Sequence, residues 1–121
     1  MSVGKSRRGH AFFIKKKYLY TINPYGIRRV YMRIDIIRIS PYVLRKLYEK
    51  HNILAEEIRQ VLEKNEPIFK KVGGNQYVAI GRYYKYLTIF FTYDEKTKQA
   101  TITTAYASDK KQVRYYKRLR R

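Results

Sequence analysis

The side chains in this sequence that could do chemistry are mainly cations and tyrosines. Its 121 residues include 28 lysines and arginines, 14 tyrosines and 5 phenylalanines, against 9 acids and 2 histidines. Cations neutralise phosphate oxygens, and flat aromatic rings stack on unpaired bases. Together they favour nucleic acid as the partner, ahead of an anionic membrane surface or an acidic protein.

The positive charge gathers at the two ends of the sequence. Residues 1–33 hold nine lysines and arginines and no acid, and residues 109–121 hold seven against Asp109 alone. A folded domain gains no stability from such self-repulsion, so a polyanionic partner is the natural explanation. We predict nucleic-acid contacts from the cations at both ends and from three in the middle: Arg7, Arg8, Lys15, Lys16, Lys17, Arg28, Arg29, Lys70, Lys71, Arg82, Lys110, Lys111, Arg114, Lys117, Arg118, Arg120 and Arg121.

Several function classes are disfavoured. The absence of cysteine excludes disulfides and thiolate metal sites, and His10 and His51 lie too far apart to indicate a metal site. No Gly-rich phosphate loop of the GxxxxGK type is present, so we expect no cofactor and no metal. The longest apolar runs are far shorter than the roughly 20 residues that span a bilayer. We therefore expect a cytoplasmic protein with no membrane partner. The cysteine-free composition rich in Tyr, Ile and Lys is thermophile-like.

The first third of the sequence has strand-like segments. Residues 12–22 and 27–39 are rich in aromatic and β-branched residues, and residues 23–26, Asn-Pro-Tyr-Gly, predict a turn between them. An N-terminal hairpin and an extended arm wrapped on RNA need the same residues. We therefore expect a basic arm or hairpin over residues 1–31 and one domain over residues 32–121. The second strand should place on one face Val30, Met32, Ile34 and Ile36.

Two helices should follow. Ser40 as N-cap and Pro41 at the first helical position start a helix that ends near His51. A second helix is predicted over residues 54–64, with acids in its first turn where the helix dipole favours them. The residues predicted to form their buried stripes are Leu44, Leu47 and Tyr48 in the first helix and Leu54, Ile58, Val61 and Leu62 in the second.

After Pro67 the apolar residues alternate with a period of two. Four antiparallel strands are predicted, over residues 68–72, 76–82, 86–93 and 99–106, with tight turns at 73–75 and 83–85. Ser108 or Asp109 should cap a last, basic helix. This order predicts an α+β fold, in which two helices pack on an antiparallel sheet of four to five strands and a basic helix follows.

Several short motifs follow one another in a recognisable order: Lys50-His51-Asn52-Ile53 before Glu56-Glu57, then Tyr77-Val78-Ala79-Ile80-Gly81-Arg82, Tyr86-Leu87-Thr88-Ile89-Phe90-Phe91, and Ile102-Thr103-Thr104-Ala105 before a basic helix. In this order the chain from about residue 34 onward resembles the BrnT-type toxins. These are small ribonucleases of toxin–antitoxin pairs with a RelE/ParE-like fold. The basic arm lies outside the family pattern.

The sequence departs from that family where its chemistry is expected. Tyr106 stands where the family has an arginine, and Gln112 aligns with the family's glutamate in the last helix, although Tyr116 matches the family's tyrosine. Tyr84-Lys85 replaces a Gly-Arg pair in a shorter turn. A glutamine cannot take a proton as a glutamate does, and a tyrosine offers phosphate no bidentate cation.

The resemblance implies metal-independent RNA cleavage. Such cleavage needs a base for the 2′-OH proton, cations for the charge that develops on phosphorus, and an acid for the leaving 5′-oxygen. If the chain is an active ribonuclease, the catalytic candidates are His51, Arg82, Lys85, Tyr106, Arg114 and Tyr116.

Two main hypotheses follow. In the first, the toxin-like fold with degenerate catalytic positions binds RNA, above all ribosomal RNA, and its basic tails become ordered on the phosphates. In the second, the protein is an active endoribonuclease toxin (an mRNA interferase) that acts on ribosome-bound mRNA and is neutralised by an acidic antitoxin protein. Non-specific DNA binding is a third alternative. It ranks below the other two because the sequence has no helix-turn-helix pair with a convincing recognition helix.

Overall fold

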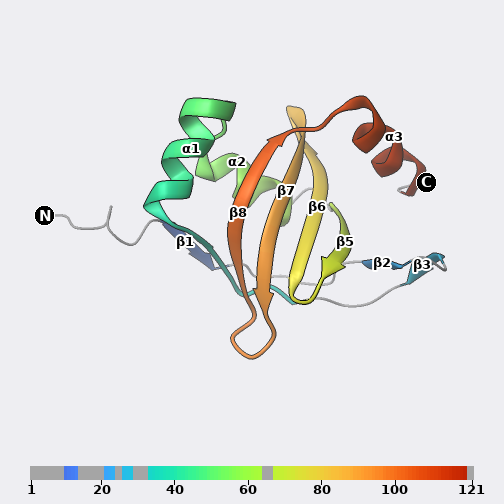
Figure 1. The fold of residues 1–121 in the computed structure, drawn as a ribbon, viewed down its shortest axis with the longest axis horizontal. Helices are drawn as coiled ribbons and strands as arrows, with labels where there is room; N and C mark the ends of the chain where they lie inside the picture. The colour runs from blue at the N-terminus through green and yellow to red at the C-terminus, as the bar shows by residue number, and fades with distance from the viewer. Residues whose placement is uncertain (1–9, 14–20, 24–25, 29–32, 64–66, 120–121) are drawn as a thin grey trace, which may run out of the picture.

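The structure is a computed structural model, which describes residues 10–13, 21–23, 26–28, 33–63 and 67–119. Its centre is a twisted sheet with the strand order β1-β4-β8-β7-β6-β5-β2-β3. In Figure 1 helix α1 lies at the upper left of the sheet, helix α2 passes behind it, and helix α3 lies at its upper right. The predicted α+β class and the order of elements from residue 36 onward are confirmed.

Four long strands form the antiparallel meander that the sequence predicts. They are β5 (Ile68–Gly73), β6 (Gln76–Tyr83), β7 (Lys85–Asp94) and β8 (Gln99–Ala107). The β5–β6 turn needs glycine, because Gly73 and Gly74 have φ angles of 153° and 50°. The β7–β8 turn is closed by the Asp94 carboxylate, which accepts hydrogen bonds from two backbone N–H groups of the turn.

The prediction of a purely antiparallel sheet is wrong. Strand β4 (Ile36–Ile39) pairs in parallel with β8, so the sheet is mixed. Parallel pairing is possible here because α1 and α2 carry the chain away from β4 and back to β5, on the far side of the meander. Periodicity within a strand carries no information about the direction of its neighbour.

The prediction of one long strand over residues 27–39 is also wrong. Residues 33–35 lie outside any strand, and the backbone N–H of Asp35 donates to the Lys98 carbonyl oxygen at 2.7 Å. In β4 the fully buried side chains are Ile37 and Ile39, whereas Ile36, which was predicted for the apolar face, is half-buried. Residues 30 and 32 lie outside the described residues.

Three short strands from the N-terminal segment extend the sheet at its two edges. Strand β1 (His10–Phe13) pairs with β4, and strands β2 (Thr21–Asn23) and β3 (Gly26–Arg28) pair with each other across the predicted turn. Strand β2 also pairs in parallel with β5. The described part of residues 1–31 therefore contains both a hairpin and a separate edge strand.

Helices α1 (Pro41–His51) and α2 (Ala55–Glu63) have the predicted bounds to within a residue. The Ser40 hydroxyl accepts a hydrogen bond from the Val43 N–H at 3.2 Å, which confirms the predicted N-cap. Two predicted core residues are wrong, because Tyr48 is 61% exposed and Leu54 is 54% exposed. Tyr48 lies at the edge of the stripe of α1, where a small rotation moves a side chain into solvent, whereas Leu54 precedes the first residue of α2.

The apolar core lies between these two helices and one face of the sheet. From α1 and α2 it takes Leu47, Ile58, Val61 and Leu62, and from the sheet it takes Ile37, Phe69, Leu87, Ile89, Phe91 and Ile102. Gly81 lets α2 approach β6 closely, because a Cβ there would lie 2.7 Å from Val61 Cγ1. Helix α3 (Lys110–Leu119) packs on the opposite face, where Thr88 points away from its buried neighbours Leu87 and Ile89.

Candidate nucleic-acid interface

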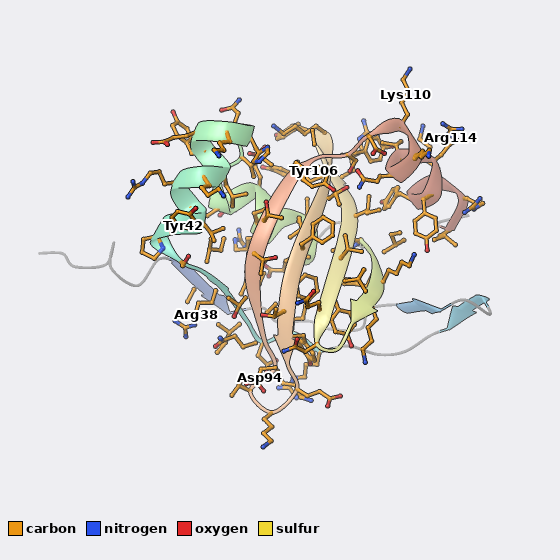
Figure 2. All side chains as sticks on the ribbon, viewed as in Figure 1. Arg38, Tyr42, Asp94, Tyr106, Lys110 and Arg114 are labelled. Atoms are coloured by element: carbon orange, nitrogen blue, oxygen red, sulfur yellow. The ribbon has the colours of Figure 1, made fainter. Side chains whose placement is uncertain are left out.

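Helix α3 is the most strongly basic element among the described residues. Five of its ten residues are cations and none is an acid: Lys110, Lys111, Arg114, Lys117 and Arg118. All five are exposed, and none takes part in an ion pair among the described residues. Figure 2 shows Lys110 and Arg114 directed outward from the helix. The helix therefore presents solvated positive charge, which a phosphate backbone can neutralise.

The start of α3 is fixed by a capping box. The Gln112 N–H donates to the Asp109 carboxylate at 2.8 Å, and the Asp109 N–H donates to Gln112 Oε1 at 2.9 Å. The one acid beside the helix is thus used locally, at the end where the helix dipole favours negative charge. This confirms Asp109 as the predicted cap.

Gln112 also ties α3 to the sheet. Its side-chain oxygen accepts a hydrogen bond from the Thr88 hydroxyl at 3.0 Å, and its Nε2 donates to the Tyr106 hydroxyl at 3.3 Å. Thr88 is completely buried, and its hydroxyl lies 2.7 Å from the Ser108 hydroxyl. A polar network rather than an apolar core therefore sets the position of α3 on this face.

Aromatic rings between α3 and the sheet lie close to cations. Two guanidinium or ammonium groups lie over the Tyr86 ring, with Arg82 at 5.4 Å and Lys117 at 5.9 Å from its centroid. Lys70 and Arg118 lie at 5.7 Å and 5.5 Å from the Tyr115 ring centroid. Tyr86 in turn packs edge-on against Tyr116, with ring centroids 5.6 Å apart. We call this set the α3 surface: Lys70, Arg82, Tyr86, Tyr115, Tyr116, Lys117 and Arg118.

The carboxylates of the described residues lie away from the α3 surface, apart from Asp109. Three of them are on α2, on the opposite face of the sheet, where Glu56 and Glu63 form ion pairs with Arg59. The hydrogen bonds that Arg59 donates to Glu56, with the charge of Glu56 and Glu63, raise the pKa of Arg59 above its ordinary value. The acids Glu56 and Glu63 of α2 are therefore paired on that face, whereas the five cations of α3 form no ion pair among the described residues.

Two of the catalytic candidates come together at the upper end of β8. The His51 ring, at the end of α1, lies 6.3 Å from the Tyr106 ring, and Tyr106 also packs against Phe90 at 5.8 Å. In Figure 2 Tyr106 lies at the upper end of the sheet, between α1 and α3. The His51 side chain is exposed.

The other catalytic candidates occupy separate positions. Lys85 is directed to the α2 side, with its Nζ 3.5 Å from the Asn52 carbonyl oxygen and 3.9 Å from a Glu57 carboxylate oxygen. Arg82 and Tyr116 both belong to the α3 surface, while Arg114 is on the outer side of α3.

The predicted nucleic-acid contacts are described only in part. Lys70 and Lys71 are both exposed on β5, and Lys70 belongs to the α3 surface. Strand β3 contains Arg28, whose side chain is not described, and eight more of the predicted contacts lie outside the described residues: Arg7, Arg8, Lys15, Lys16, Lys17, Arg29, Arg120 and Arg121.

Sequence reasoning missed the residues that hold the interface together. Thr88 and Gln112 were not predicted to act structurally, although the pattern Asp109-x-x-Gln112 is a readable capping-box signal. Tyr86 and Tyr115 were not singled out either, because nothing in a sequence with so many tyrosines marks the ones that end beside cations.

Among the residues that the structure describes, no group of three or more His, Cys, Asp or Glu side chains could hold a metal ion. Within the same residues, no helix is both long and apolar enough to cross a bilayer.

Comparison with known proteins gives no match of any kind. No family model fits the sequence, no curated protein is similar to it, and no solved structure matches its fold. The toxin resemblance therefore stays a hypothesis, and the argument for a function depends on the geometry of the interface.

Proposed function

We propose that this protein binds RNA, with structured RNA such as ribosomal RNA as its principal target. The observation that carries the proposal is the α3 surface, where cations lie over tyrosine rings on one side of the sheet. Lysine and arginine side chains neutralise phosphates, and exposed ring edges and faces between them can contact bases or riboses. The net charge of +19 adds to the positive electrostatic potential around this surface.

Charge-matched variants test this proposal. Lys117→Gln with Arg118→Gln removes two charges from the α3 surface, and Arg45→Gln with Lys50→Gln removes two exposed charges from α1 as the control. Affinity for a structured RNA should fall more in the α3 variant. The slope of log affinity against log salt should also decrease by about one per lost phosphate contact. Equal losses in both variants would assign the binding to overall charge, and the same affinity for duplex DNA would support the DNA alternative.

A second candidate function is metal-independent cleavage of RNA, which needs an acid, a base and nearby cations. The proximity of His51 and Tyr106 is the observation that favours it. His51 would take the proton of a 2′-OH, whose oxygen attacks the adjacent phosphorus, and Tyr106 would protonate the leaving 5′-oxygen. The products would be a 2′,3′-cyclic phosphate and a 5′-hydroxyl. An acidic antitoxin would then be the expected partner protein.

Incubation with ribosomes and with free mRNA separates the two functions. Defined cleavage that is lost in both His51→Gln and Tyr106→Phe would establish the ribonuclease. Stable co-sedimentation with ribosomal subunits, without new RNA ends, would establish the binding protein.

A further inference from the structure

The β6–β7 turn has a conformation that its residue does not favour. Tyr84 is the single residue between the two strands, and its φ angle is 65°. Side chains with a Cβ rarely adopt this left-handed region, and glycine or asparagine is the usual choice. At the opposite end of the same hairpin strand, the β5–β6 turn uses Gly73 and Gly74 for its positive φ angles. The chain therefore has a tyrosine where the backbone alone would favour a glycine.

Tyr84 is also the most exposed large hydrophobic side chain of the described residues, at 87%. One part of its ring contacts Tyr83, with ring centroids 4.6 Å apart and planes inclined at 59°. Tyr83 itself packs against the apolar core, so it supports the outer ring from below. Neither burial nor core packing explains why Tyr84 is an aromatic residue.

The turn has a cation on each side in sequence, Arg82 and Lys85, and Lys85 lies on the α2 side with its Nζ 3.9 Å from a Glu57 carboxylate oxygen. In Figure 1 the turn stands at the upper end of the sheet, between α1 and α3. Lys110, at the start of α3, lies toward the same end of the molecule (Figure 2). A strained, exposed ring supported by a second ring is suited to stack on a base, while Arg82 and the cations of α3 hold the adjoining phosphates.

We propose that Tyr84 is a stacking wedge for an unpaired base of RNA, in a bulge or a loop beside paired segments. This inference rests on the proposed RNA binding and names the feature of the RNA that is recognised. Paired bases are already stacked on both sides, so the ring gains a partner only where a base lies outside the helix. The α3 surface supplies affinity for any backbone, and Tyr84 supplies the preference for an unpaired base.

The test compares two RNA hairpins that differ by one bulged 2-aminopurine. The wild-type protein should bind the bulged hairpin about tenfold more tightly than the fully paired one, because stacking on an aromatic side chain is worth roughly that factor or more. It should also change the fluorescence of the 2-aminopurine. Tyr84→Phe keeps the ring and should retain both effects. Tyr84→Asn suits the left-handed backbone but lacks the ring, so it should lose both.

Thermal unfolding gives an independent readout. Tyr84→Asn should melt a few degrees higher than the wild-type protein, because relief of backbone strain stabilises the native state. A lower melting temperature together with unchanged RNA preference would make Tyr84 a packing residue and overturn the inference.

The outcomes also distinguish this inference from the proposed function. If the wild-type protein and Tyr84→Asn bind both hairpins equally well, the wedge is wrong and RNA binding stands. If the wild-type protein binds neither hairpin in low salt, both proposals fail.

Discussion

The two faces of the sheet are built by different means. The face toward α1 and α2 is closed by an apolar core, in which Ile37, Ile58 and Leu87 are fully buried, and its nearby acids pair with Arg59. On the face toward α3, hydrogen bonds through Thr88 and Gln112 tie the helix to the sheet, and the five cations of α3 form no ion pair among the described residues. Stability is concentrated on the first face, and the capacity to bind an anion is concentrated on the second.

Two adjacent phenylalanines on β7 provide the test of this difference with the largest expected effect on stability. Phe91 is buried on the core face, 5.9 Å from the Phe69 ring and 5.8 Å from the Tyr77 ring. Phe91→Ala should lower the free energy of unfolding by about 3–5 kcal/mol, through lost burial and a cavity. Phe90→Ala, on the half-buried opposite face, is the matched control and should cost about 1 kcal/mol. Urea denaturation measures both, and similar losses would refute the asymmetry.

The close approach of α2 to the sheet gives a second prediction. Gly81→Ala should lower the free energy of unfolding by about 1–3 kcal/mol, because the new Cβ would overlap Val61 and press on Pro67. Gly73 and Gly74 in the exposed β5–β6 turn cannot serve as controls, because an alanine at their positive φ angles would be strained for a different reason. The double variant Gly81→Ala with Val61→Ala should recover part of the loss, and no recovery would show that the contact is not the cause.

The polar anchor of α3 gives a third prediction. Thr88→Val keeps the shape of the side chain but removes the hydroxyl that lies between Ser108 and Gln112. The free energy of unfolding should fall by about 1–2 kcal/mol, because buried partners lose a hydrogen bond. Protection of the α3 amides from hydrogen exchange should fall, while the α1 amides keep theirs. Uniform loss across both helices would mean that α3 and the core unfold as one unit.

The smallest expected effect concerns alkaline pH. Burial, with the nearby charge of Glu95, raises the pKa of Tyr77 and of Tyr93 above their ordinary value. As pH rises above about 10, the unfolded chain releases these protons first, so stability is lost as pH rises toward the folded pKa values. Tyr77→Phe should make the decline above pH 10 shallower. An identical decline in the variant would exclude Tyr77 as a contributor.

Local signals allowed most of the core-side elements to be predicted from the sequence. Ser40-Pro41 marks the start of α1, and the alternation from residue 86 to 93 marks β7, because capping and period depend on neighbours in the chain. The direction of β4 could not be predicted, because it depends on which strand lies beside it. The exposed position of Tyr48 depends on the rotation of α1, which is set by tertiary packing, and Leu54 lies before the first residue of α2.

The candidate site was harder to predict, because its residues act through partners that are distant in sequence. From the sequence, Gln112 was interpreted as a degenerate catalytic position, because it aligns with a glutamate of the BrnT-type toxins. In the structure its side chain caps α3 and contacts Thr88 and Tyr106. His51 and Tyr106 were both candidates, but their approach to 6.3 Å depends on the end of α1 lying beside the end of β8. Cations could be counted from the sequence, whereas the tyrosines they lie over could not be identified.

The position of β1 and β2 at opposite ends of the strand order has a consequence for truncated forms. Strands β4 and β5 would become the outermost strands of the sheet if the N-terminal segment were removed, and each would expose a row of backbone donors and acceptors. Exposed rows of this kind recruit strands from other molecules and promote aggregation. Cleavage by a protease within residues 14–20 would separate β1 from β2 along the chain. Strand β1 would then stay attached only through its pairing with β4.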